Sequence, residues 1–251
     1  MVTQRKVTRK TRSDAGTTRT VKPKFMEERQ QKVQSKPIVP MNDKQREYID
    51  LINEKNVIVA TGYPGTSKTY LPTAIAADLY KLGQINKIYI TRPAVSTSKS
   101  IGYTKGSFLE KMTPWLGGVI PIFQERLGKP EFEIALEAED ITYIPMETIK
   151  GMSISDGWLL VEEASDLTKD EVIKIVTRMG KGSKLILSGD IRQSELKETS
   201  GLAWMADFVS RHNLNKNFGF IDFNDVNDIV RSNTVREFIV CLVRDEKKGQ
   251  Q

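Results

Sequence analysis

The most informative stretch of the chain is VIVATGYPGTSKT, residues 57–69. Its first half is apolar and rich in β-branched residues, which is typical of a buried strand. Its second half supplies Gly, Pro and Gly before Lys68 and Thr69, and a helical pattern rich in Ala and Leu follows. This order of strand, glycine-containing turn and helix predicts a loop whose backbone N–H groups surround a phosphate.

The stretch departs at one position from the P-loop pattern of Gly, four residues and Gly-Lys-Ser/Thr, because Ser67 stands where the second Gly belongs. Lys68 is predicted to reach the β- and γ-phosphates, and the Thr69 hydroxyl to ligate Mg²⁺. The alternative is an ordinary strand–turn–helix whose lysine only faces solvent. The loop residues predicted to bind ATP are Gly62, Tyr63, Pro64, Gly65, Thr66, Ser67, Lys68, Thr69 and Tyr70.

Composition bounds the class of protein. A chain of 251 residues, 39% hydrophobic, is long enough for one large α/β domain or two small ones. It contains no apolar run near the ~20 residues of a membrane span and no apolar signal segment at its start, so we expect a cytoplasmic protein, in the host cell if a phage encodes it. The single cysteine, Cys241, excludes an intramolecular disulfide and is predicted to be a small core residue. With one His and one Cys, no Cys/His zinc site is expected.

Charge is concentrated at the N-terminus. Residues 1–40 contain 11 Lys/Arg and 3 Asp/Glu, a net charge of +8, whereas the whole chain carries +6. This segment is poor in apolar residues, so we expect a largely disordered basic tail over 1–40 and a folded domain over 41–251. The tail is either an arm attracted to nucleic acid or a solubilising or processing segment.

The remaining pattern alternates strands and helices. Several of the strands are continuous apolar runs, which favours a mostly parallel sheet covered by helices on both faces. The predicted strands are 56–61, 87–91, 142–144, 158–161, 184–187 and 218–223. The predicted helices are 42–54, 68–82, an interrupted helix over 108–127, 132–138, 169–179, 201–208 and 234–243.

A second motif is the apolar strand 158–161, which is followed at once by Glu162 and Glu163. Beside a phosphate loop, the first carboxylate would hold the Mg²⁺ shell and the second would orient or deprotonate the attacking water. Most P-loop enzymes of this type have Asp in the first position, and Glu162 is one methylene longer. The alternative is a pair of solvated acids at a strand end.

A third motif is Ser188-Gly189-Asp190 with Gln193 after the strand 184–187. A neutral amide near the γ-phosphate can sense that phosphate and orient water, and the string is similar to a superfamily 1 helicase motif. The alternative is a plain turn in which Asp190 caps a helix. Gln45, in the helix before the first strand, resembles the adenine-binding glutamine of helicases.

Together these strings resemble the PhoH-like family of P-loop ATPases. The resemblance covers about residues 43–244 and is carried by TRPAV (91–95), IGY (101–103), Gly106 with LEKM (109–112), TRMG (177–180), GSK (182–184), SGD (188–190) with Gln193, SGL (200–202), and Asp225-Val226 with Val230-Arg231. The short form is similar to phage members. The resemblance implies a RecA-like P-loop NTPase fold and Mg²⁺-dependent ATP hydrolysis by a ring, expected to be a hexamer, acting on or alongside RNA.

The resemblance also implies further site residues. A ring needs an arginine that reaches a neighbour's γ-phosphate, for which Arg178 and Arg231 are candidates, each with a surface ion pair as the alternative. Single-stranded RNA or DNA would contact Lys99, Tyr103 and Lys105 in a polar loop, unless that loop is only a solvated connection. The expected function is ATP hydrolysis coupled to single-stranded nucleic acid, as in a helicase or translocase. The alternative is a nucleotide-dependent regulator or scaffold with weak turnover.

Overall fold

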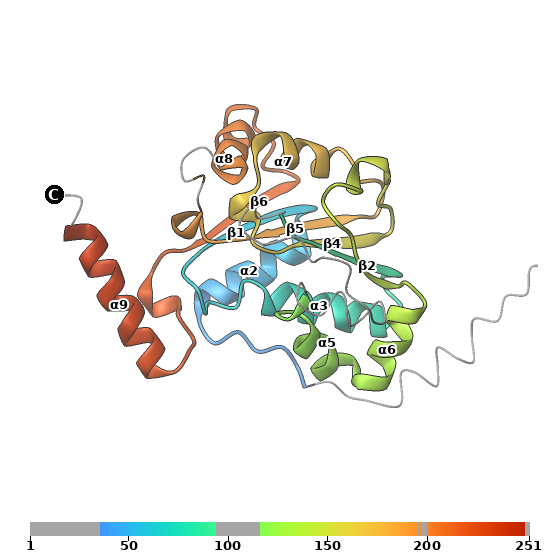
Figure 1. Cartoon of the computed structure of the whole chain (residues 1–251), viewed down its shortest axis with the longest axis horizontal. Coiled ribbons are helices and arrows are strands. Elements are labelled where there is room, and N and C mark those ends of the chain that lie inside the picture. The colour runs from blue at the N-terminus through green and yellow to red at the C-terminus, as the bar shows by residue number, and fades with distance from the viewer. Residues whose placement is uncertain (1–35, 94–115, 195, 197–199, 249–251) are drawn as a thin grey trace, which may run out of the picture. The chain divides into compact units, whose positions relative to one another are not determined.

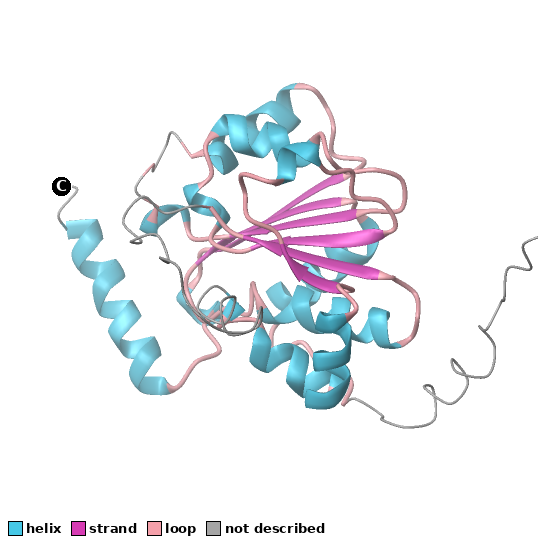
Figure 2. Cartoon of the chain, turned by 45° about the vertical axis from the view of Figure 1, so that its right-hand side comes forward, coloured by secondary structure: helices cyan, strands magenta, loops and turns pink. Residues whose placement is uncertain are grey.

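A six-stranded, wholly parallel sheet forms the centre of the domain (Figures 1 and 2). The computed structural model describes residues 36–93, 116–194, 196 and 200–248. The strand order is β3-β2-β4-β5-β1-β6, so β5 separates β1 from β4. The strands are β1 (Val57–Gly62), β2 (Lys87–Thr91), β3 (Ile141–Tyr143), β4 (Gly157–Val161), β5 (Lys184–Ser188) and β6 (Phe218–Phe223). The predicted RecA-like α/β fold is confirmed.

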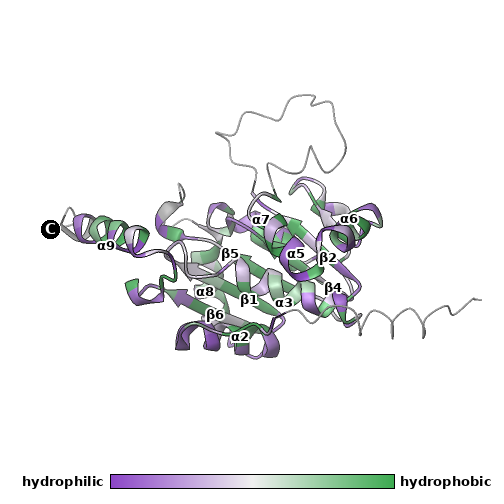
Figure 3. Cartoon of the chain, turned by 90° about the horizontal axis from the view of Figure 1, so that it is seen from below, coloured by the Kyte–Doolittle hydropathy of each residue, from purple (hydrophilic) through white to green (hydrophobic). Residues whose placement is uncertain are grey.

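Helices cover both faces of this sheet, as predicted (Figure 2). One face packs against α2 (Asp43–Glu54), α3 (Tyr70–Lys81), α5 (Ile120–Leu127) and α6 (Lys129–Glu137), and the other against α7 (Lys169–Val176) and α8 (Gly201–Arg211). Alternation along β1 explains both layers, because Ile58 and Ala60 enter the first core while Val57 and Val59 enter the second. Figure 3 shows hydrophobic residues along the strands and hydrophilic ones on α2.

Local capping explains where the helices begin. The Asn42 side chain accepts a 2.8 Å hydrogen bond from the Gln45 backbone N–H at the start of α2. Thr168 and Glu171 form a capping box at α7. The helix predicted from residue 68 begins instead at Tyr70, because the preceding residues belong to the loop that follows β1. Short 3₁₀ helices are η1 (Ile149–Gly151), η2 (Ala164–Asp166), η3 (Ile191–Gln193) and η5 (Val226–Asp228).

The C-terminal helix α9 (Asn233–Lys248) corrects one prediction. Cys241 is exposed and is not a core residue. The helix packs by Ile239, with Ile229 and Tyr63, on one side only, and Phe238 is 64% exposed. A continuous apolar run in a helix spreads around the axis, so part of it faces away from the domain. In the described part of the chain, no helix is long and apolar enough to span a bilayer.

Candidate functional site

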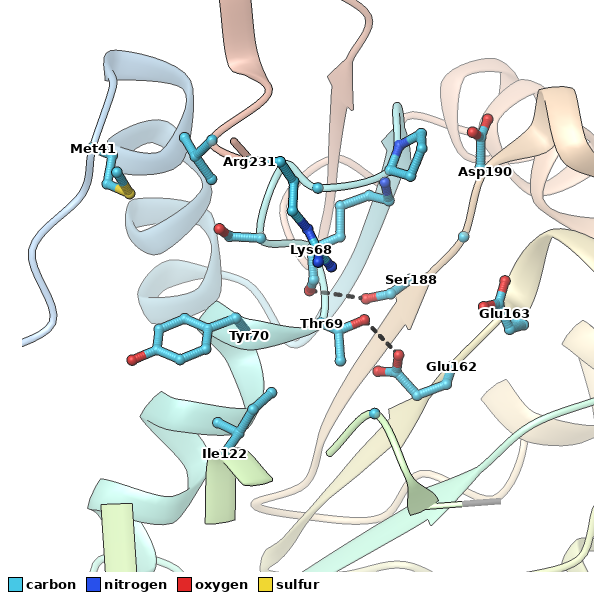
Figure 4. A pocket seen from close by; sticks show the side chains of 16 residues that line it. Met41, Lys68, Thr69, Tyr70, Ile122, Glu162, Glu163, Ser188, Asp190 and Arg231 are labelled. Atoms are coloured by element: carbon cyan, nitrogen blue, oxygen red, sulfur yellow. Dashed lines mark hydrogen bonds between the residues drawn. The ribbon is translucent and has the colours of Figure 1, made fainter. Parts of the chain in front are cut away.

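A cavity of about 590 Å³ lies where β1, β4 and β5 end (Figure 4). Parallel strands present their carboxyl ends at one edge of the sheet, so the loops after these three strands meet there. The cavity is lined by Met41, Pro64, Gly65, Ser67, Lys68, Thr69, Tyr70, Gly118, Ile122, Glu162, Glu163, Ser188, Gly189, Asp190, Val230 and Arg231. The three motifs singled out in the sequence therefore border one space.

The loop after β1 requires unusual backbone conformations. Gly62 has φ +122°, and a Cβ there would lie 2.3 Å from the Phe223 carbonyl oxygen. Gly65 has φ +79°, and a Cβ there would lie 2.4 Å from Cγ of Arg231. Ser67 has φ 73°, in the left-handed region where the P-loop pattern places Gly. Ser67 therefore holds a backbone conformation that favours glycine and is strained for serine.

The Lys68 ammonium lies inside this loop. Its Nζ donates hydrogen bonds of 2.6 Å to the carbonyls of both Gly62 and Tyr63, and it lies 3.4 Å from the Thr66 hydroxyl. Burial lowers the pKa of Lys68 to about 8, while Asp190 opposes that shift. An anion in the cavity would favour the charged ammonium, which is the electrostatic requirement for binding phosphate.

The side chain of Gln45 holds the loop through hydrogen bonds. Its side-chain Nε2 lies 3.4 Å from the Thr66 carbonyl oxygen and 3.2 Å from Oγ of Ser67, and its Oε1 accepts a 2.8 Å bond from the Met41 N–H. Gln45 is only 1% exposed, so its amide is bonded within the chain. The cavity lining excludes it, together with Gly62, Tyr63 and Thr66.

Two hydroxyl groups hold the loop at its other side. The Lys68 carbonyl accepts hydrogen bonds of 3.2 Å from Tyr48 and from Ser188. Tyr48 was not among the site residues predicted from the sequence. A buried tyrosine hydroxyl needs a partner, and that requirement is the signal that could have linked it to the loop.

The carboxylates after β4 face the start of α3. The Thr69 hydroxyl donates a 2.5 Å hydrogen bond to Glu162 Oε2 (Figure 4). Burial raises the pKa of Glu162 to about 7, and the bond from Thr69 opposes the rise. Glu163 is exposed to the cavity and has φ 52°, another left-handed backbone at a residue other than Gly. The hydrogen bond from Thr69 shows that Glu162, one methylene longer than Asp, still reaches this hydroxyl.

The oxygen atoms of Thr69 and Glu162 suit a hard cation such as Mg²⁺. Within the described residues, no group of three or more His, Cys, Asp and Glu could hold a metal by itself. Mg²⁺ in nucleotide sites usually combines one or two protein oxygens with phosphate oxygens and waters, and two such oxygens are what this site offers.

The segment after β5 approaches the loop through a residue that sequence analysis missed. The Arg192 guanidinium stacks 3.5 Å from the centre of the Tyr63 ring, and its backbone N–H donates to Asp190. Only the backbone of Gln193 is described, in η3 at this edge of the sheet. The adjacent Arg–aromatic pair was not recognisable from sequence, because its members lie 129 positions apart in the chain.

The two candidate arginines lie in different places. Arg231 lines the cavity of its own chain and packs on Gly65. Arg178 lies outside the lining, and its guanidinium donates a 2.9 Å bond to the Lys150 carbonyl. The predicted nucleic-acid residues Lys99, Tyr103 and Lys105, like the tail up to residue 35, lie outside the described residues.

Comparison with known proteins finds one family over most of the chain. A family model described as "PhoH-like protein" matches residues 37–242. A PhoH-like protein of Bacillus subtilis is 34% identical over 161 residues, which is 63% of this chain and 50% of that protein. The Mycobacterium bovis PhoH-like protein is 27% identical over 223 residues, covering 85% and 60%. Protein PhoH of Escherichia coli K12 is 28% identical over 200 residues, covering 78% and 55%.

The matched region spans about half the length of these relatives. Among solved structures, the large terminase of a thermophilic bacteriophage matches 80% of this chain and 50% of its own, with 12% identity and a TM-score of 0.49.

Proposed function

The chain belongs to the PhoH-like family, and on that premise we propose that it binds ATP with Mg²⁺ and hydrolyses it. The observation that carries the proposal is the meeting of Lys68, the Thr69–Glu162 pair and Glu163 around one cavity at the ends of parallel strands. These groups supply a cation, metal-binding oxygens and a carboxylate that can act on water. We call this part of the cavity, formed by Lys68, Thr69, Glu162 and Glu163, the phosphate end.

Triphosphate binding is assigned to the loop and the helix after it. The backbone N–H groups of residues 63–69 and the N-terminus of α3 favour an anion. The Lys68 ammonium exchanges the carbonyls of Gly62 and Tyr63 for the β- and γ-phosphate oxygens. Gln45, Tyr48 and Ser188 hold the loop in place through the hydrogen bonds described above.

The hydrolytic step is assigned to the acids after β4. Thr69 and Glu162 would hold Mg²⁺, which neutralises charge on the phosphates when bound. Glu163 orients the attacking water and accepts its proton, and its exposed carboxylate leaves room for that water. Gln193 senses the γ-phosphate, and Arg231 balances its charge from within the same chain.

An assay on the purified chain tests this function. We expect Mg²⁺-dependent release of phosphate from ATP that EDTA abolishes and that Glu163→Gln reduces to background. ATP binding without turnover, even with Mg²⁺, would contradict hydrolysis and support a nucleotide-binding scaffold. No binding of any nucleotide would contradict the whole assignment.

We further propose that hydrolysis is coupled to single-stranded RNA or DNA, as in a helicase or translocase. Support comes from the net charge of +8 over residues 1–40. Stimulation of the ATPase by single-stranded RNA supports coupling, whereas hydrolysis without stimulation supports a nucleotide-dependent regulator. The contacts are assigned to Lys99, Tyr103 and Lys105 and to the basic tail.

Deletion of residues 1–35 separates these two contributors. It spares Lys36, whose carbonyl accepts a 2.7 Å hydrogen bond from the buried Arg126. We expect the fold and ATP binding to survive, while RNA affinity falls and its salt dependence becomes weaker. An unchanged slope in filter binding across a salt series would exclude the tail from the contact. A truncated protein that fails to fold would contradict the domain boundary.

Self-association into a ring, with a hexamer as the expected size, is part of the same proposal. Arg178, which lies outside the lining of its own cavity, is the better candidate for a residue acting on a neighbour. Mixing Arg178→Ala and Lys68→Ala chains should restore part of the ATPase activity, since some sites then combine an intact Lys68 with a neighbour's Arg178. Mixtures as inactive as either variant would contradict the role in trans. The assembly is proposed to work in the cytoplasm.

A further inference from the structure

The cavity continues past the phosphate loop, away from the carboxylates. In Figure 4, Met41, Tyr70 and Ile122 lie on the opposite side of Lys68 from Glu163. They line this part of the cavity, which we call the apolar end. A triphosphate held at the phosphate end, with its γ-phosphate near Glu163, would direct its nucleoside toward the apolar end.

The side chains of the apolar end are a thioether, a phenol ring and an isoleucine. Flat ring systems bind well to such surfaces, and methionine adapts to ligands of different shape. Met41 is 71% exposed, so its side chain is accessible to a ligand. The apolar end therefore offers contact area for a nucleobase.

The polar side-chain groups near this end are engaged within the chain. The Tyr70 hydroxyl donates a 3.1 Å hydrogen bond to Glu125 Oε1. The Gln45 amide is bonded on both its oxygen and its nitrogen, to Met41 on one side and to the phosphate loop on the other. Among the described residues that line the cavity, none has a side-chain amide.

We propose that the apolar end is a nucleobase subsite that holds the base by contact and does not distinguish adenine from guanine. The inference rests on the proposed nucleotide function and gives it a substrate class, purine nucleoside triphosphates in general. A site built to hydrogen-bond a substrate rejects the wrong analogue by factors of about 10⁴–10⁵, whereas an apolar pocket discriminates only weakly. Gln45 then acts as a positioning residue, which holds the phosphate loop through Thr66 and Ser67.

Calorimetric titration of the full chain with Mg-ATP, Mg-GTP and inorganic tripolyphosphate tests the subsite. We expect dissociation constants for ATP and GTP within about tenfold of each other. Both should be at least about tenfold lower than that for tripolyphosphate, because the base adds contact area. A preference above about a hundredfold for either nucleotide, or tripolyphosphate binding as tight as ATP, would overturn the inference while leaving the phosphate site intact. Failure of all three to bind would overturn the proposed function as well.

Two variants test the roles of the subsite and of Gln45. Met41→Ala removes an exposed side chain of the apolar end, so ATP and GTP should bind about tenfold more weakly and tripolyphosphate as in the wild type. Gln45→Ala should weaken ATP, GTP and tripolyphosphate by the same factor, because it loosens the loop. Selective loss of ATP in Gln45→Ala would mean that Gln45 recognises adenine, and unchanged nucleotide affinity in Met41→Ala would place the base elsewhere. Thermal unfolding of both variants checks that they fold.

Discussion

The phosphate end and the apolar end of the cavity impose different demands on the chain. At the phosphate end, Ser67 and Glu163 hold left-handed backbones with φ 73° and 52°, and burial raises the pKa of the half-buried Glu162. At the apolar end, Met41 and Ile122 contribute apolar side chains that need neither a charge nor an unusual backbone, and Met41 is exposed. Strain and desolvation thus accumulate where charge must be positioned.

The two ends should therefore tolerate change unequally. Phosphate binding needs atoms in set positions, and loss of one charge removes an interaction that no neighbour replaces. Contact with a base is spread over several side chains, so loss of one of them removes only part of the affinity.

Lys68→Ala should have the largest effect. It removes the ammonium from inside the loop, so we expect no measurable ATP hydrolysis and weakening of ATP and tripolyphosphate by the same large factor. Calorimetry measures both affinities, with Lys129→Ala, an exposed residue of α6, as the control. Undiminished ATP affinity in Lys68→Ala would mean that the phosphate end does not bind the triphosphate.

Glu163→Gln should separate binding from chemistry at the phosphate end. The amide keeps the shape of the carboxylate and loses its ability to accept a proton, so turnover should fall by roughly 10²–10⁴ with ATP still bound. Single-turnover assays and calorimetry on the same preparation measure the two effects. Turnover at the wild-type rate would mean that another residue orients the attacking water and accepts its proton.

Glu162→Gln should show how much the raised pKa of Glu162 lowers the stability of the folded protein. The pKa of Glu162 is raised from 4.5 to about 7, so the folded state binds its proton more tightly than the unfolded state does. Stability is therefore lost as pH rises from about 4.5 to 7, by up to about 3 kcal/mol. We expect Glu162→Gln to be more stable than the wild type at about pH 8 without Mg²⁺.

The gain in stability should vanish below about pH 4.5, where the acid is neutral in both states. Urea unfolding across pH measures it, and Glu163→Gln, an exposed change, is the matched control. If the wild type were as stable as Glu162→Gln at about pH 8, folding would not raise the pKa of Glu162 in the absence of metal.

Ser67→Gly should have the smallest effect. Glycine relieves the left-handed backbone at φ 73° but loses the hydrogen bond between Gln45 and the serine hydroxyl. These terms oppose each other, so we expect ATPase activity within about threefold of the wild type or somewhat above it. Ser67→Ala, which keeps the strain and loses the hydroxyl, is the control. If both variants lose ATP binding, the hydroxyl is a ligand.

The features that could be predicted from the sequence are those encoded within one short stretch of the chain. The phosphate loop and the acids after β4 are short strings that follow apolar strands, and parallel strands must bring their ends together, so the meeting of Lys68 with Glu162 followed from sequence. Six strands were predicted within about two residues of their observed bounds.

The other parts depend on contacts between distant segments. Met41 and Ile122 join the cavity only because the segment before α2 and the start of α5 pack beside α3. The stack of Arg192 on Tyr63 and the exposure of Cys241 likewise depend on tertiary packing. Local pattern carries no information on such pairings.

A crystal structure of Glu163→Gln with Mg-ATP would show both ends of the cavity occupied at once. We expect the triphosphate in the loop with its γ-phosphate at Lys68, and the adenine against Met41 and Tyr70. Triphosphate bound outside this loop, or adenine hydrogen-bonded to the Gln45 amide, would contradict this expectation.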